Sequence, residues 1–338
     1  MGNTSYIVLG NGFSIDLINH IEDASVKNKI NLKNLFEMGD EVIWPKSTEK
    51  GFLSRKHCPH LWTLGARPTL SDLETSEVIT EIITCMNVYN LVKSKESDIA
   101  LKEQENIYIQ AYNELCTYLK YLFVFYNEQI QDDKDLKPII EEIELVSYIK
   151  NELCKGNEVI IVTYNYDIFL ERLLKISKIP FLIEGINKKS KINKVRIIKP
   201  HGSISFSIPT TMHTYNIKNI SDSIQKDMKE IIIDNNPKDE NSSLCAIIPP
   251  AGDSERVISG WSKTLRDRLD KYIKKSTEKD TLMIYGLSYD HVDRMEMDNI
   301  ITQINSNVKV TYINPYPSKT LDAVLSSVFE NYYQLKSL

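Results

Sequence analysis

Near the start of the chain stands Tyr6-Ile7-Val8-Leu9-Gly10-Asn11-Gly12-Phe13-Ser14, an apolar run followed by a glycine-containing turn. Short apolar runs with β-branched residues are typical of buried strands. After the turn, Ile15, Ile18 and Ile21 recur at the spacing of one helix face, which predicts a helix over Ser14–Ile21. The stretch therefore predicts a strand, a tight turn and a helix, the unit from which α/β sheets are built.

The same alternation returns in the second half of the chain. Further strands are predicted at Glu158–Thr163, Pro180–Ile183, Val195–Ile198, Cys245–Ile248, Leu282–Tyr285 and Val308–Ile313. Helices are predicted between several of them, at Asp167–Ile176, Trp261–Lys275 and Val292–Ile304. Short apolar strands that alternate with helices are typical of a parallel sheet covered on both faces. We therefore expect an α/β fold with a Rossmann-like, doubly wound and mostly parallel sheet.

The middle of the chain has a different pattern. From Leu70 to Cys154 there is no glycine and one proline, and Asp72–Lys93 and Glu103–Asn127 have a helical period. We expect a single domain over residues 1–338 with a helical insertion at 68–155. The polar stretch Ser221–Ser243 is predicted to be a solvated loop.

The composition is that of an ordinary globular protein, with 42% hydrophobic and 26% charged residues and a formal net charge of -5. Because a nucleic-acid-binding protein usually carries a clustered basic surface, this mild acidity predicts no direct contact with nucleic acid. The first residues lack the basic region of a signal peptide, and no segment approaches the roughly 18 apolar residues of a membrane helix. We expect a cytoplasmic protein without a membrane segment.

The cysteines and histidines indicate no metal site. Five cysteines are scattered along the chain, as in a protein with reduced, mostly buried thiols. The segment His57-Cys58-Pro59-His60 has residue types that bind zinc, but no second pair follows at a ligand spacing. A structural role is favoured for this segment, and no metal is expected.

Polar or glycine-containing turns follow the predicted strands. Gly10 and Gly12 lie where an open α/β sheet brings backbone N–H groups to a pyrophosphate, although a plain tight turn would need the same glycines. Ser14 would either donate to a phosphate or cap the helix. After the strand Glu158–Thr163, Asn165 and Asp167 would either face a ligand or serve the turn and cap the next helix.

A third turn, Lys199-Pro200-His201-Gly202-Ser203, follows the strand Val195–Ile198. The ordinary pKa of histidine, near 6.5, suits proton transfer at neutral pH, but a lone histidine is more often structural. Gly286-Leu287-Ser288-Tyr289-Asp290 and Ile313-Asn314-Pro315 end two further strands. Because the carboxyl ends of parallel strands point to one crevice, we treat the five turns as one constellation.

Taken in order, these turns resemble the cofactor site of the sirtuin fold, which has Gly-Ala-Gly-x-Ser, Thr-Gln-Asn-Ile-Asp, His-Gly, Gly-Thr-Ser and a final Asn. Here the corresponding segments are Gly10-Asn11-Gly12-Phe13-Ser14, Thr163-Tyr164-Asn165-Tyr166-Asp167, His201-Gly202, Gly286-Leu287-Ser288 and Asn314. The variants Thr-x-Asn-Tyr-Asp, Pro-His-Gly-Ser and Gly-x-Ser-x-Asp look like those of the bacterial sirtuin-like NADases of antiphage defence. The resemblance covers both ends of the chain and leaves out the helical middle.

The sequence departs from that of deacetylase sirtuins in one region. Between His201 and Gly286 those enzymes carry a zinc ribbon of two Cys-x-x-Cys pairs, whereas this chain has only Cys245 there. The strand that holds an acetyl-lysine peptide has no recognisable counterpart, and Ala246-Ile247-Ile248-Pro249-Pro250 stands in its place. Both differences weaken a deacylase interpretation and favour water as the acceptor.

The resemblance implies NAD as the substrate and a role for each matching residue. Asn165 would bind the nicotinamide ribose and help to place a water, and His201 would act as general base. Asp167 would lie near the nicotinamide end. The phosphates and the adjoining ribose would be bound by Gly10, Asn11, Gly12, Ser14 and Asp16, and the adenosine half by Gly286, Ser288, Asp290 and Asn314. Cleavage passes through an oxocarbenium-like ribose, which needs orientation and nearby negative or dipolar groups.

The resulting hypothesis is an NAD+ hydrolase (NADase) that releases nicotinamide and ADP-ribose and depletes NAD+ during phage infection. Because such an activity must be silent until triggered, we expect a homo-oligomer and control by a partner. By resemblance that partner is a HerA-type ATPase or another sensor protein. The helices of 68–155 would be either an assembly surface or a small lid over the cofactor cleft. Two alternatives stay open: NAD-dependent protein deacylation or ADP-ribosyl transfer, and a non-catalytic NAD or ADP-ribose sensor.

Overall fold

A computed structural model describes residues 2–45, 47–93, 106–186, 194–209, 226–234, 243–249, 260–289 and 294–337. Its centre is a seven-stranded sheet with the order β10-β9-β8-β1-β2-β4-β3, in which all neighbouring strands are parallel. The strands are β1 (Thr4–Leu9), β2 (Glu158–Thr163), β3 (Phe181–Ile183), β4 (Val195–Ile198), β8 (Thr281–Tyr285), β9 (Lys309–Ile313) and β10 (Tyr332–Leu335). The predicted α/β, Rossmann-like sheet is confirmed.

The central strand β1 is apolar because both of its faces are buried. Its residues alternate between two hydrophobic clusters: Ile7 and Leu9 belong to one, and Tyr6 and Val8 belong to the other. Each cluster is completed by helices that pack on that face of the sheet. Helices therefore cover both faces, which is the doubly wound arrangement.

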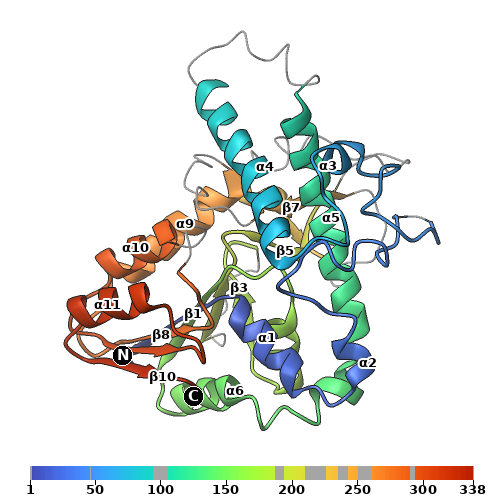
Figure 1. Cartoon of the computed structure of the whole chain (residues 1–338). Helices are drawn as coiled ribbons and strands as arrows, with labels where there is room; N and C mark the ends of the chain where they lie inside the picture. The colour runs from blue at the N-terminus through green and yellow to red at the C-terminus, as the bar shows by residue number, and fades with distance from the viewer. Residues whose placement is uncertain are drawn as a thin grey trace.

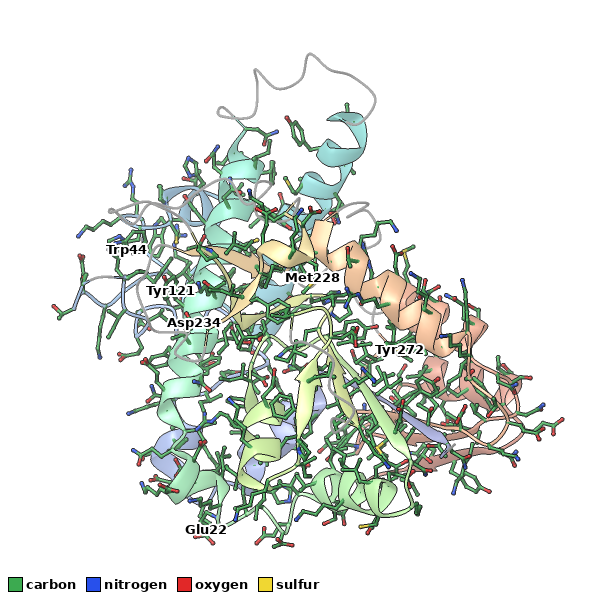
Figure 2. All side chains as sticks on the ribbon, turned by 180° about the vertical axis from the view of Figure 1, so that it is seen from behind. Glu22, Trp44, Tyr121, Met228, Asp234 and Tyr272 are labelled. Atoms are coloured by element: carbon green, nitrogen blue, oxygen red, sulfur yellow. The ribbon has the colours of Figure 1, made fainter. Side chains whose placement is uncertain are left out.

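One face of the sheet is covered by α1 (Asn11–His20), α6 (Glu144–Cys154) and α7 (Phe169–Ile176), and the other by α9 (Gly260–Ile273), α10 (Arg294–Gln303) and α11 (Lys319–Val328). Figure 1 shows α1 and α6 together on one side, and α9, α10 and α11 in orange and red on the other. Figure 2 shows the same layers from behind, with Tyr272 on α9 and Met228 close to that helix. No helix in the described ranges is both long and apolar enough to cross a bilayer.

A second layer lies above the carboxyl edge of this sheet (Figure 1). It contains a small antiparallel sheet with the order β6-β5-β7, made of β6 (Ile232–Ile233), β5 (Gly202–Pro209) and β7 (Ser243–Ile247). Against this sheet packs α5 (Ile107–Gln129), which also contacts α3 (Pro59–Thr63) and α4 (Asp72–Lys93). The shorter elements are α2 (Ala24–Lys27), the π-helix η2 (Asp132–Leu136) and the 3-10 helix η3 (Met228–Glu230).

Helices from the middle of the chain pack in both layers. Of the predicted insertion, α4 and α5 pack against each other in the upper layer, whereas α6 packs against β2 of the main sheet. The division into one domain with an insertion at 68–155 stays a prediction.

Several predicted boundaries were wrong by a few residues. The first helix begins at Asn11 rather than at Ser14, α5 spans Ile107–Gln129 rather than Glu103–Asn127, and α7 begins at Phe169 rather than at Asp167. In the last case Asp167 accepts a hydrogen bond from the Phe169 N–H (3.1 Å), so it lies before the helix. The described part of Ser221–Ser243 holds η3 and β6 instead of a continuous loop.

The elements that were not predicted include β5, α11 and β10. The strand β5 alternates serine with apolar residues, and its three serines, Ser203, Ser205 and Ser207, are all buried. Ser203 Oγ donates to the Tyr166 carbonyl oxygen (3.3 Å) and accepts from Ser205 Oγ (3.1 Å). Because the hydroxyls of Ser203 and Ser205 find partners inside the protein, these two polar residues are compatible with burial.

Candidate functional site

The predicted site residues meet at a topological switch point of the sheet. The chain passes from β1 to β2 on one side and later returns to β8 on the other side of β1. In open α/β sheets, ligands bind beyond the carboxyl ends of the strands at such a point. The turns after β1, β2 and β8 all lie at this point.

The turns after β1 and β8 are joined backbone to backbone. Gly10 N–H donates to the Tyr285 carbonyl oxygen (3.0 Å), and Gly12 N–H donates to the Gly286 carbonyl oxygen (2.8 Å). A Cβ on Gly12 would lie 2.5 Å from the Cα of Gly286, and Gly286 itself has a φ of +67°. The close approach therefore explains these glycines, and the N–H groups of Gly10 and Gly12 are already used inside the protein.

Asn165 joins the turn after β2 to the turn after β1. Its Nδ2 donates to the Gly10 carbonyl oxygen (3.0 Å) and to Ser14 Oγ (2.9 Å). Ser14 Oγ in turn donates to Asp167 Oδ2 (2.7 Å). Ser14 and Asp167 are buried, whereas Asn165 is partly exposed. Three of the predicted residues thus form one hydrogen-bonded cluster, in which Asn165 faces solvent most.

The carboxylate of Asp167 lies in a buried charged group. Lys199 Nζ donates to the Asp167 carbonyl oxygen (2.6 Å) and to Glu171 Oε1 (2.9 Å), and all three side chains are buried. Burial raises the pKa of the Asp167 carboxyl above its usual range, while Lys199 and the Ser14 hydroxyl act in the opposite direction. A buried carboxylate is thereby held beside Ser14 and Asn165.

His201 follows β4 and is buried, with an exposed fraction of 2%. Its Nε2 lies 2.9 Å from Oε1 of Glu296, a buried residue in the first turn of α10. Its ring lies against that of Tyr164, with 4.9 Å between the centroids. Since Tyr164 directly precedes Asn165, the histidine borders the Asn165 cluster through this tyrosine.

Asp16 and Asn11 have partners within the protein. Tyr285 OH donates to Asp16 Oδ2 (2.6 Å), and burial together with this hydrogen bond raises the pKa of Tyr285. Asn11 Nδ2 donates to the Leu32 carbonyl oxygen (2.8 Å), although the residue is exposed. Both side chains lie on α1 next to the glycine turn, where the resemblance implies the phosphates and the adjoining ribose.

The residues predicted for the adenosine half lie after β8 and β9. Asn314 Nδ2 donates to the Leu287 carbonyl oxygen (3.0 Å), and Asn314 Oδ1 accepts from the Tyr316 N–H (2.9 Å). This asparagine therefore joins the two turns. Ser288 is exposed, and Asp290 lies outside the described residues.

No protein-family model matches the sequence, and no curated protein matches it significantly. The functional assignment therefore depends on the geometry described above and on the resemblance of the short motifs.

The segment His57-Cys58-Pro59-His60 makes separate contacts with the protein. His57 stacks on Trp44, with 4.1 Å between the ring centroids, and Cys58 Sγ donates to the Phe52 carbonyl oxygen (3.3 Å). His60 Nδ1 lies 2.5 Å from Glu114 Oε1. These contacts attach the segment to α5 and to neighbouring loops. No group of three His, Cys, Asp or Glu side chains with metal-binding geometry occurs within the described ranges.

Three residues next to the predicted site were not expected from the sequence: Glu171, Lys199 and Glu296. Lys199 stands in the quoted turn before His201, and a lysine that directly follows an apolar strand was a signal that could have been used. Glu296 is 95 residues from His201 in the sequence, so only the packing of α10 brings the two together.

Proposed function

We propose that this protein is an NAD+ hydrolase that cleaves the bond between nicotinamide and ribose. The observation that supports this proposal most is the Ser14, Asn165 and Asp167 cluster at the switch point, with His201 beside it. In Rossmann-like sheets, dinucleotides bind at this same edge, beyond the carboxyl ends of the strands. The cluster contains an amide, a hydroxyl and a carboxylate, which are groups that orient and stabilise a positively charged ribose.

Asn165 would bind the substrate through its amide oxygen. Its Nδ2 already donates two hydrogen bonds, to the Gly10 carbonyl oxygen and to Ser14 Oγ, which orients the side chain. The acceptor Oδ1 is then the atom that meets a ribose hydroxyl or the attacking water. Asp167 would stabilise the positive charge that develops on the ribose, because its carboxylate lies one hydroxyl away from Asn165.

The reaction requires one bond to form and one to break. The water oxygen attacks C1′ of the ribose, and the C1′–N bond breaks with its electron pair going to nicotinamide, which leaves as a neutral molecule. The water gives up one proton, and we propose that His201 accepts it. The products are ADP-ribose, nicotinamide and one proton. Because His201 is only 2% exposed, the surrounding segments must separate before a substrate can reach it.

The resemblance extends this proposal to a cellular role. The protein would deplete NAD+ in response to phage, as part of a homo-oligomer and beside a HerA-type ATPase or another sensor protein. A silent resting state is required for such a role, and the buried His201 is compatible with it.

A second candidate is a sensor that binds NAD or ADP-ribose without turnover. The burial of His201 and its contact with Glu296 favour this candidate, because a histidine that stays enclosed serves packing rather than proton transfer.

The two candidates are separated by measuring nicotinamide and ADP-ribose release from NAD+ alongside NAD+ binding. For a hydrolase, Asn165→Ala and His201→Ala should each lower the release by about 100-fold or more. Asn307→Ala, which changes an exposed asparagine, is the matched control and should keep wild-type release. Tight binding without release at any protein concentration, or with a HerA-type partner present, would favour the sensor. Release that persists in both site variants would contradict the proposed residues.

A further inference from the structure

A buried lysine joins the turn after β4 to the turn after β2. Lys199 is 1% exposed, and its Nζ donates to the Asp167 carbonyl oxygen (2.6 Å) and to Oε1 of Glu171 on α7 (2.9 Å). Lysine is almost never fully buried unless its charge is paired. The resemblance of the motifs assigns no role to Lys199 or Glu171, so their burial beside the proposed site needs another explanation.

Docking of these two turns does not require a charge. The Tyr166 carbonyl oxygen accepts from the Ile204 N–H (2.9 Å) and from Ser203 Oγ (3.3 Å), so neutral groups already join the same turns. A buried ammonium costs more free energy than such neutral groups, because a charge must leave water. The positive charge of Lys199 is therefore the property that its neutral neighbours cannot replace.

The hydrogen bonds of Asp167 suit an ionised carboxylate. Its Oδ1 accepts from the Phe169 N–H (3.1 Å) and its Oδ2 accepts from Ser14 Oγ (2.7 Å), so each oxygen receives a donor. The residue is only 3% exposed, and burial opposes the charged form. A nearby positive charge is the remaining means of favouring the carboxylate, and Lys199 lies against this residue.

Within the described ranges, the charged groups that act on Asp167 are Lys199 and Glu171, and they act in opposite directions. Burial has the largest effect and raises the pKa of Asp167, Lys199 lowers that pKa, and Glu171 raises it. Glu171 Oε2 has no hydrogen-bond partner among the described residues, so the Lys199 ammonium is the polar contact that compensates the burial of Glu171. Two carboxyl groups and one ammonium thus share an enclosed space.

We propose that Lys199 and Glu171 are positioning residues that set the charge of Asp167, with Lys199 favouring the carboxylate and Glu171 opposing it. The inference rests on the proposed NAD+ hydrolysis, in which the Asp167 carboxylate stabilises the positive ribose. Both residues act through Asp167 and do not touch the substrate. A purely structural role predicts a loss of stability for either variant, whereas this charge-setting role predicts opposite effects on Asp167.

A spectroscopic test measures the ionisation of Asp167 without turnover. In protein labelled with 13C-aspartate, the Asp167 carboxyl signal is assigned by its absence from Asp167→Asn and followed from about pH 4 to about pH 9. In Lys199→Met, which removes the charge, the titration midpoint should move to a pH at least about 1 higher. In Glu171→Gln it should move to a lower pH. Lys279→Met, at an exposed position, is the control.

The kinetic test asks whether this charge is used in NAD+ cleavage. Below the wild-type midpoint, kcat/KM of Lys199→Met should be about 10-fold lower than that of the wild type. Above the variant's midpoint the two values should agree within about 3-fold, because Asp167 is then ionised in both proteins. Glu171→Gln should be faster than the wild type below the wild-type midpoint. Comparing each variant with the wild type at the same pH cancels the titration of other groups.

Three results would overturn the charge-setting role. One is an Asp167 midpoint that neither variant changes, and another is a change in the same direction in both. The third is a ratio of variant to wild-type kcat/KM that is constant with pH although the midpoints move. If the midpoints move in opposite directions but the wild type does not cleave NAD+, the hydrolase is refuted and the charge-setting role stands. If Lys199→Met fails to fold, Glu171→Gln still decides, since its midpoint must fall.

Discussion

At the scale of single residues, Gly10 and Gly12 at the switch point show that one glycine pattern fits two structural explanations. The pattern is typical both of a phosphate-binding loop and of a tight turn. In the structure, Gly10 and Gly12 give their N–H groups to the β8 turn, and the absence of side chains lets the two backbones touch. Close backbone packing is therefore a sufficient reason for these glycines, whatever the turn binds.

A pair of glycine substitutions separates backbone strain from this close contact. Gly65 has a φ of +98° with nothing within 4 Å of an added Cβ, so Gly65→Ala should cost about 1–2 kcal/mol of unfolding free energy. Gly286 has a φ of +67°, and its added Cβ would lie 2.6 Å from the Cα of Gly12. Gly286→Ala should therefore cost about 1–3 kcal/mol more than Gly65→Ala. Urea unfolding of both variants measures the difference, and equal costs would argue against the close contact.

At the scale of elements, the N-terminus of the short helix α3 is capped by a side chain from α5. Glu114 of α5 is buried and accepts hydrogen bonds from the N–H groups of His60 (3.0 Å) and Leu61 (2.8 Å), as well as contacting the His60 ring. A five-residue helix has little stability of its own, and a carboxylate at its N-terminus satisfies free N–H groups and the helix dipole.

Replacing Glu114 tests this capping contact. Glu114→Ala should lower the unfolding free energy by about 3 kcal/mol because it leaves buried N–H groups without a partner. Glu114→Gln keeps an acceptor and should lower it by about 1 kcal/mol. Chemical unfolding gives these values, with the exposed Glu142→Ala as the control. A Glu114→Ala variant as stable as the control would show that water replaces the carboxylate at no cost.

At the scale of the whole molecule, the buried charges beneath the site make the stability depend on pH. Burial raises the pKa of Asp167 in the folded protein. The folded state therefore binds this proton more tightly than the unfolded state, and the stability contributed by protonation is complete below the ordinary carboxyl pKa. It is lost as the pH rises through the raised folded pKa.

Asp167→Asn measures this dependence. The variant has no charge to desolvate, so the stability of the wild type relative to Asp167→Asn should be higher at about pH 4.5 than at about pH 8. Thermal unfolding of both proteins across this range provides the comparison. A relative stability that is constant with pH, or that rises toward pH 8, would contradict the raised pKa.

Several strands and helices could be predicted because each has a recognisable sequence pattern within a few neighbouring residues. The strand Glu158–Thr163 and the helix Asp72–Lys93 have the predicted bounds, since a buried strand and a long helix each carry their pattern within a few residues. The helix α11 also carries such a signal, with Leu321, Val324, Leu325 and Val328 on one face after the capping Ser318, although it was not predicted. The edge strand β10 has no apolar run and forms by pairing with β9.

By itself the sequence determined the α/β class, the order of most strands and helices along the chain, and the set of turns whose polar residues gather at one edge. It could do so because the carboxyl ends of parallel strands must lie together. Only the tertiary structure decided which of these residues touch: Asn165 with Ser14, and His201 with Glu296. Hydrogen bonds between residues 95 to 151 positions apart leave no local pattern, because they form only when helices and turns dock on the sheet.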